Sequence, residues 1–218
     1  MPHAQPDGYI AISSASNGDA VLVLHAWWGL NNNMRAFCDR LAASGFIAFA
    51  PDLYHGKITD TIAEAEVLSN ELSPDQARAD IADAMEFLRD RANESDPGLA
   101  VIGFSLGAYF ALDLSVTHPD HIRSVVVFYG TRAGDYSNSQ AAYLGHFAEA
   151  DEFEPQSDVD ELEAALQRAG RPVSFYSYPG TGHWFFEPDR SQAFNQAAAD
   201  LAWEQTLTFL RRSSLSLD

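Results

Sequence analysis

The run LAVIGFSLGAYFALDL, residues 99–114, places an apolar segment directly before a glycine-flanked serine and a second apolar segment directly after it. The first segment reads as a buried strand, and residues 106–116 read as a helix. Between them lies the pattern G-x-S-x-G, with Ser105 at its centre. A sharp strand-to-helix turn crowds the backbone, and the small Gly103 and Gly107 leave room for it. We therefore expect Ser105 to stand at the carboxyl end of a parallel sheet, where ligands bind in open α/β folds.

Strand and helix patterns alternate along the rest of the chain. Short apolar runs typical of strands covered on both faces are FIAFAPDLY, LAVIGF, SVVVFYG, AAYLGHFA and PVSFYSYPG. Helices are predicted at residues 31–44, 59–72, 74–92, 106–116, 159–169 and 191–212. This alternation predicts an α/β fold, with a mostly parallel central sheet of about seven strands and helices on both faces. We expect one domain that spans residues 1–218.

The first two apolar runs, GYIAIS and AVLVLH, are separated by SASNGD. The pair Asn17-Gly18 favours the positive backbone angles of a tight hairpin turn. The sequence therefore predicts an antiparallel start in which these two strands pair with each other.

Charge and cysteine content limit the partners of the protein. The chain has 31 acidic and 13 basic residues and a formal net charge of -18, which repels nucleic acids and anionic lipids. The lone Cys38 cannot form a disulfide within the chain, and it reads as a partly buried structural thiol. With no signal-peptide pattern and no apolar run of bilayer length, we expect a cytoplasmic protein, a monomer or small homo-oligomer. No metal or cofactor motif is present, and we expect neither.

A serine nucleophile needs a general base and an acid that orients the base, in the chain order Ser, Asp or Glu, His. His183 follows an apolar strand in the loop YPGTGHWFFEP, and we predict it as the base. His118 and His121 flank Pro119 and read as surface residues, whereas His146 is more consistent with a structural role.

Four acidic residues follow the strand that ends at Phe147, in the run AEADEFEP. These are Glu149, Asp151, Glu152 and Glu154. Loop acids are usually solvated, so at least three of them read as surface charges. Asp151 is the predicted orienting acid because it lies just past the strand end, with Phe153 and Pro155 to anchor the loop.

The motifs GFSLGA, LGHFAEADEFEP and YPGTGHWF, together with WWGLNNNMRAFCDRLAASGFIAFAPDLYHG, resemble the dienelactone hydrolase family of the α/β-hydrolase superfamily. The resemblance covers nearly the whole chain, with the motifs in the family's order. It implies Ser105 as nucleophile, Asp151 as acid and His183 as base, with oxyanion donors from the backbone N–H groups of Trp27 and Leu106.

The chain also departs from the family pattern. Dienelactone hydrolases proper have a cysteine nucleophile and a glutamate that controls it, where this chain has Ser105 and Ala26. Their arginine after the histidine, which helps to hold a substrate carboxylate, corresponds to Glu187, and an acid there would repel that carboxylate. Arg35 and Arg132 are the alternative cations nearest to the motif loops.

The sequence therefore predicts a serine hydrolase that cleaves a small, uncharged ester or lactone through an acyl-enzyme. We expect Trp28, Tyr54, Phe104 and Trp184 to line an apolar substrate cleft, with core packing as the alternative for Trp28 and Phe104. Two other functions stay open. One is a true dienelactone hydrolase (carboxymethylenebutenolidase) acting on a carboxylated lactone, and the less favoured one is a non-catalytic binding protein with the same fold.

Overall fold

The computed structural model describes residues 3–13, 19–92 and 98–215. Within them, seven strands form one sheet in the order β1-β3-β2-β4-β5-β6-β7. The strands are β1 (Gly8–Ile12), β2 (Ala20–Leu24), β3 (Ile47–Pro51), β4 (Leu99–Phe104), β5 (Ile122–Phe128), β6 (Ala142–Ala148) and β7 (Val173–Tyr178). Strands β2 to β7 run parallel, and β1 pairs antiparallel with β3 at one edge. The predicted mostly parallel α/β architecture is confirmed.

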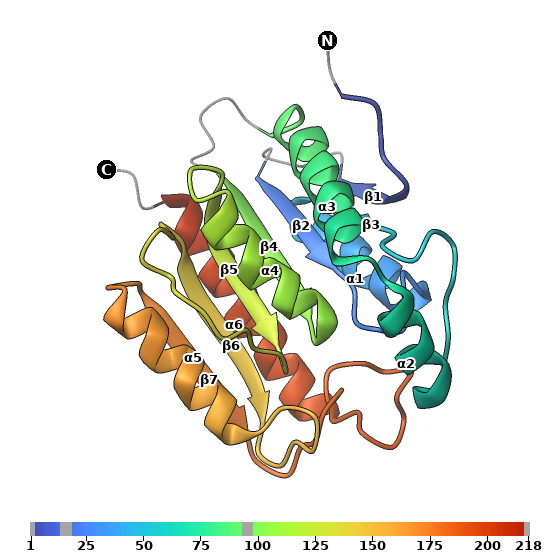
Figure 1. The fold of residues 1–218 in the computed structure, drawn as a ribbon, viewed down its shortest axis with the longest axis vertical. Coiled ribbons are helices and arrows are strands. Elements are labelled where there is room, and N and C mark those ends of the chain that lie inside the picture. The colour runs from blue at the N-terminus through green and yellow to red at the C-terminus, as the bar shows by residue number, and fades with distance from the viewer. Residues whose placement is uncertain (1–2, 14–18, 93–97, 216–218) are drawn as a thin grey trace.

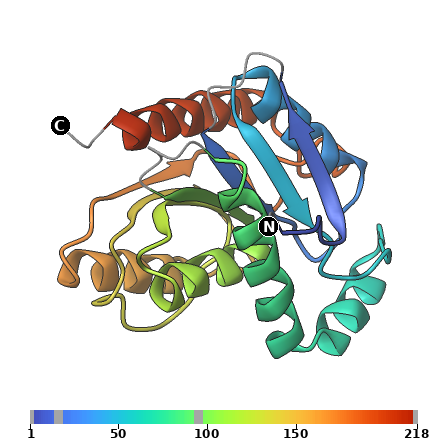
Figure 2. The ribbon, with the colours of Figure 1, turned by 90° about the horizontal axis from the view of Figure 1, so that it is seen from above.

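Helices cover both faces of this sheet (Figures 1 and 2). They are α1 (Asn32–Ala43), α2 (Ile62–Glu71), α3 (Pro74–Arg89), α4 (Leu106–Thr117), α5 (Gln156–Arg168) and α6 (Gln196–Leu215). Helices α1 and α6 lie on one face, while α3, α4 and α5 lie on the other, as Figure 2 shows in profile. Because β2, β3 and β4 are covered on both faces, every residue in them is buried.

Local sequence sets where the helices begin. Ser73 caps α3 by accepting a hydrogen bond from the backbone N–H of Gln76, and Pro74 occupies the first helical position. Helix α3 then buries Ile81, Met85 and other residues at helical spacing against the sheet. Two predicted helices are shorter at their start: α2 begins after its cap Thr61, and α6 begins only at Gln196.

The predicted hairpin between the first two strands is wrong. Strand β3 lies between β1 and β2, so β1 pairs with β3 through contacts such as Ile10 with Phe49. The turn residues Asn17 and Gly18 lie outside the described residues. The long-range pairing with β3 places the apolar β1 at the sheet edge, beside α1.

No helix in the described ranges combines the length and the apolar character that a bilayer crossing requires.

Candidate active site

Ser105 occupies a strained turn between β4 and α4. Its backbone angles are φ 48° and ψ -109°, in a region that residues other than glycine rarely adopt. The turn is tight enough that a Cβ on Gly103 would lie 2.6 Å from the backbone nitrogen of Ala108. A Cβ on Gly107 would likewise collide with the backbone carbonyls of Leu24 and His25. The two glycines therefore permit the turn that presents Ser105.

His183 lies in the loop after β7 and links Ser105 to Asp151. Its Nε2 is 3.1 Å from Ser105 Oγ, and its Nδ1 is 2.7 Å from Asp151 Oδ2 and 2.9 Å from Asp151 Oδ1. The side chains of His183 and Asp151 are both almost fully buried. An ionised carboxylate only accepts hydrogen bonds, so Nδ1 carries the proton and Nε2 is free to accept the serine hydroxyl proton.

The loop after β6 holds the Asp151 carboxylate in place. Asp151 Oδ1 accepts hydrogen bonds from the backbone N–H groups of Phe153 (2.9 Å) and Glu154 (3.0 Å). The Glu154 carboxylate in turn accepts from Thr131, through its backbone N–H (3.1 Å) and its hydroxyl (2.6 Å). Burial raises the pKa of Glu154. The loop is thereby fixed both to itself and to the segment that follows β5.

The other two loop acids have different surroundings. Glu149 is exposed, and its Oε2 accepts from the backbone N–H of Gly180 (2.9 Å), which ties the acid loop to the histidine loop. Glu152 is exposed on the same loop. Of the four acids, Asp151 alone is within hydrogen-bond distance of His183 among the described residues.

The first turn of α4 lies against the end of β2, since Gly107 packs on the Leu24 and His25 carbonyls. Trp27 follows two residues later, in the turn closed by the hydrogen bond from Gly29 N–H to the Ala26 carbonyl (3.2 Å). In the described part of the chain, the backbone N–H groups of Leu106 and Trp27 donate to no other residue. Both donors are available at the end of the sheet that carries Ser105.

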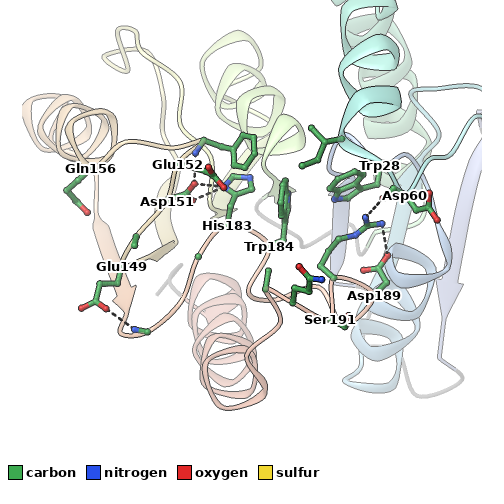
Figure 3. A pocket seen from close by; sticks show the side chains of 18 residues that line it. Trp28, Asp60, Glu149, Asp151, Glu152, Gln156, His183, Trp184, Asp189 and Ser191 are labelled. Carbon is green, nitrogen blue, oxygen red and sulfur yellow. Dashed lines mark hydrogen bonds and ion pairs between the residues drawn. The ribbon is translucent and has the colours of Figure 1, made fainter.

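A cavity of about 1100 Å³ adjoins His183 and Asp151. Trp184 stands between His183 and Trp28 (Figure 3), and carboxyl and amide side chains also line the cavity. The ring centroids of Trp28 and Trp184 are 5.2 Å apart, and those of Phe153 and Trp184 are 4.9 Å apart. These aromatic rings give the cavity an apolar wall directly beside the histidine.

Two predicted substrate-binding residues do not line this cavity. Phe104 is fully buried because it belongs to β4 and stacks on Phe128 with ring centroids 4.6 Å apart. Tyr54 packs on His25 and lines a smaller, separate cavity of about 270 Å³. Trp28 and Trp184, by contrast, both line the large cavity, and Trp27 stacks on Trp184 at 6.1 Å.

The cations predicted near the motif loops are engaged elsewhere. Arg132 pairs with the buried Asp113 (2.9 Å), and Arg35 lies over the ring of Tyr9. Arg190 lines the cavity instead, with its guanidinium 3.8 Å from the centre of the Trp28 ring. Sequence reasoning missed this residue, although it is the one arginine in the run HWFFEPDR.

The expectation that Glu187 would repel a substrate carboxylate is also wrong. Its side chain is fully buried and does not line the cavity. Burial raises the pKa of Glu187 to about 8, so the carboxyl group is mostly neutral at pH 7. Its Oε1 accepts a hydrogen bond from the Tyr129 hydroxyl at 2.7 Å.

Two other histidines are structural. His146 on β6 is fully buried, with Nδ1 2.8 Å from the Tyr178 hydroxyl and Nε2 3.0 Å from the Thr206 hydroxyl. His25 accepts from the backbone N–H of Leu53 (3.2 Å) at the end of β2. Burial lowers the pKa of both imidazoles, that of His146 to about 3. Among the described residues, no cluster of three or more His, Cys, Asp or Glu side chains suits a metal ion.

The model of the dienelactone hydrolase family matches residues 7–214. The chain belongs to the dienelactone hydrolase family. It is 32% identical over 216 residues to protein usf of Aquifex pyrophilus, covering 94% of this chain and 92% of that protein. A protein of Aquifex aeolicus, provisionally named a carboxymethylenebutenolidase, is 30% identical over 215 residues with the same coverage. The protein is thus a hydrolase of carboxylic esters or lactones, as its family indicates.

Solved structures of the family have the same fold. A Klebsiella pneumoniae protein provisionally described as a dienelactone hydrolase superposes with a TM-score of 0.82 at 22% identity, over 94% of this chain and 92% of that one. A dienelactone hydrolase-like promiscuous phosphotriesterase from metagenomic libraries gives a TM-score of 0.82 at 19% identity, covering 94% of this chain and 91% of that one.

Proposed function

We propose that the protein is a serine hydrolase that cleaves a small ester or lactone, with Ser105 as nucleophile, His183 as general base and Asp151 as orienting acid. The observation that carries this proposal is the continuous contact from Ser105 Oγ to His183 Nε2 (3.1 Å) and from His183 Nδ1 to Asp151 (2.7 Å). A serine hydroxyl attacks an ester only when a base removes its proton, and this arrangement supplies one.

The reaction proceeds in two acyl-transfer steps. His183 takes the Ser105 proton as the oxygen attacks the carbonyl carbon, and the backbone N–H groups of Leu106 and Trp27 stabilise the oxyanion. The tetrahedral intermediate collapses, His183 protonates the departing alkoxide, and the acyl group remains on Ser105. Water activated by His183 then attacks the acyl-enzyme, which releases the acid and restores the serine hydroxyl.

The aromatic wall of the cavity favours an apolar group on the substrate. Trp28, Trp184 and Phe153 lie next to His183, so a bound acyl or aryl group of moderate size would contact them. The exposed carboxylates that line the cavity, among them Asp60, Glu152 and Asp189, are unfavourable neighbours for an anion.

Covalent labelling tests the nucleophile. A serine-directed aryl phosphonate should label the wild type once per chain, and Ser105→Ala should remove both the label and the hydrolysis of a neutral aryl acetate. A thiol reagent should leave activity intact, because Cys38 is buried and burial raises the pKa of its thiol to about 12. An unlabelled, correctly folded wild type would contradict the proposal.

A second candidate is hydrolysis of a carboxylated lactone, in line with the carboxymethylenebutenolidase name of several relatives. The observation that favours it is Arg190 in the wall of the cavity. Comparing kcat/KM for a neutral aryl acetate with that for a carboxylated lactone separates the two candidates. Arg190→Met should reduce kcat/KM for the lactone alone if Arg190 binds its carboxylate.

A further inference from the structure

Glu187 is a fully buried acid behind the catalytic histidine that the mechanism above does not use. It lies four residues after His183, and its Oε1 accepts from the Tyr129 hydroxyl at 2.7 Å. Its Oε2 is buried and has no hydrogen-bond partner among the described residues. An ionised carboxylate so enclosed lacks the contacts that offset its lost hydration, whereas a protonated one tolerates the site.

The charged groups around Glu187 do not reverse the preference for its protonated form. Burial is the main cause that raises its pKa, and the carboxylate of Asp189 raises it further. The Tyr129 hydroxyl and the Arg190 guanidinium lower it, but they leave the value at about 8. Burial, Glu187 and the Asp151 carboxylate all raise the pKa of the Tyr129 hydroxyl, so Tyr129 stays neutral and keeps its proton to donate. No described cation makes an ion pair with the Glu187 carboxyl group.

Tyr129 connects Glu187 to the base. Its ring lies 4.9 Å from the His183 ring at an angle of 58°. The residue follows β5 with φ 38°, a strained angle for a tyrosine, while its backbone N–H donates to the His146 carbonyl (2.8 Å). A strained residue persists when its surroundings hold it, and here the Glu187 carboxyl group holds the hydroxyl end.

We propose that Glu187 acts in its protonated form as a positioning residue, which holds Tyr129 against the His183 ring and keeps a second buried negative charge out of the active site. The inference rests on the proposed function, because it concerns the charge balance of acyl transfer. The tetrahedral intermediate already combines the Asp151 carboxylate, an imidazolium and an oxyanion. Ionised Glu187 would add a charge that repels the oxyanion in a poorly hydrated site.

The pH profile of kcat/KM tests this role. With a neutral aryl acetate, the wild type should lose activity above pH 8, to about a tenth of its neutral value near pH 9 if the ionised form is inactive. Glu187→Gln, which stands in for the protonated acid, should lack this alkaline decline. An identical alkaline midpoint in both proteins would overturn the proposal.

Three further variants separate positioning from folding. Tyr129→Phe removes the donor that stabilises the Glu187 carboxylate, so the alkaline midpoint should move to higher pH. Glu187→Leu should lose activity at pH 7, and Glu187→Gln should recover at least about tenfold of that loss as the conservative replacement. Glu154→Gln, at a partly buried acid in the loop after β6, should keep the wild-type alkaline midpoint. If the alkaline decline disappears in Glu154→Gln but persists in Glu187→Gln, the decline belongs to Glu154 and the proposal is wrong.

An infrared measurement decides the protonation state without using activity. The difference spectrum between pH 7 and pH 10 should show the carbonyl stretch of a protonated carboxylic acid in the wild type, and that band should weaken in Glu187→Gln. Absence of the Glu187 band at pH 7 would overturn the proposal even in an active enzyme. If the phosphonate fails to label Ser105, the proposed function fails, and the infrared band still decides whether Glu187 is protonated.

Discussion

The guanidinium of Arg190 stacks on the indole of Trp28, with 3.8 Å between the guanidinium carbon and the ring centre. The same guanidinium donates to the backbone carbonyl of Asp60 through Nη1 (2.8 Å). Next to it, Asp189 accepts from the Asn31 side chain (3.1 Å). The segment between His183 and α6 is thereby joined to the turn that carries Trp27 and Trp28 and to the residues before α2.

Removing this stacking contact should loosen the segment. Arg190 is largely buried, so Arg190→Met should lower the free energy of unfolding by about 1 to 2 kcal/mol, in the range of a partly desolvated cation–π contact. Denaturant unfolding measures the change. Arg190→Lys is the matched control. It retains the positive charge, so its free energy of unfolding should fall by less than that of Arg190→Met. Equal stability of all three proteins would show that the contact contributes nothing.

Crowding and backbone conformation can be separated at two glycines. A Cβ at Gly107 would collide with the carbonyls of Leu24 and His25, so Gly107→Ala should cost about 2 kcal/mol or more and should displace Ser105. Gly170 has φ 70° but no atom within 4 Å of its Cβ position, so Gly170→Ala should cost only about 1 kcal/mol. Thermal unfolding and aryl acetate turnover together measure both effects. A milder effect at Gly107 than at Gly170 would contradict the steric account of the turn.

The hydrogen bond from His183 to Asp151 should matter more for turnover than for binding. Asp151→Asn can donate from its amide and so favours the wrong imidazole tautomer, which we expect to lower kcat by about 10⁴ with a small change in KM. Glu152→Gln, an exposed site on the same loop, is the control and should stay close to wild type. Steady-state kinetics on the aryl acetate gives both constants, and a decline in kcat of less than tenfold for Asp151→Asn would argue against the assigned acid.

His146 should make the fold sensitive to acid. Burial lowers the pKa of its imidazole to about 3, whereas an unfolded histidine titrates near ~6.5. Between these values the unfolded chain binds the extra proton, so stability should rise with pH by up to about 1.4 kcal/mol per pH unit from this group. Denaturant unfolding at pH 4.5 and 6.5 should show a steeper dependence in the wild type than in His146→Gln. Equal slopes would mean that His146 does not contribute.

Local patterns predicted the elements near the site because the relevant constraints are local. The glycines around Ser105, the proline and serine at the start of α3, and the order of Ser105, Asp151 and His183 are all readable along the chain. The pairing of β1 with β3 cannot be read along the chain. Asn17-Gly18 indicates a turn after β1, but it does not indicate that β3 inserts between β1 and β2.

The residues misread at the site were those whose environment comes from distant segments. Phe104 immediately precedes Ser105 yet points into the core, where Phe128 from the next strand covers it. Glu187 was expected to repel a substrate carboxylate, but its side chain is buried and its carboxyl group accepts a hydrogen bond from the Tyr129 hydroxyl. Arg190 adjoined a predicted helix start at residue 191, whereas the helix begins at Gln196 and leaves Arg190 free to reach the cavity.

The two backbone N–H groups that bind Asp151 have a consequence for the Ser105 hydroxyl group. Main-chain N–H groups of Phe153 and Glu154 can only donate, so Asp151 Oδ1 must accept there, and an ionised Asp151 also accepts from His183 Nδ1 through Oδ2. His183 Nε2 is then left as an acceptor, and the Ser105 hydroxyl must be the donor. Two backbone N–H groups, two and three residues past Asp151, thus stabilise the ionised acid from which the direction of each hydrogen bond out to Ser105 follows.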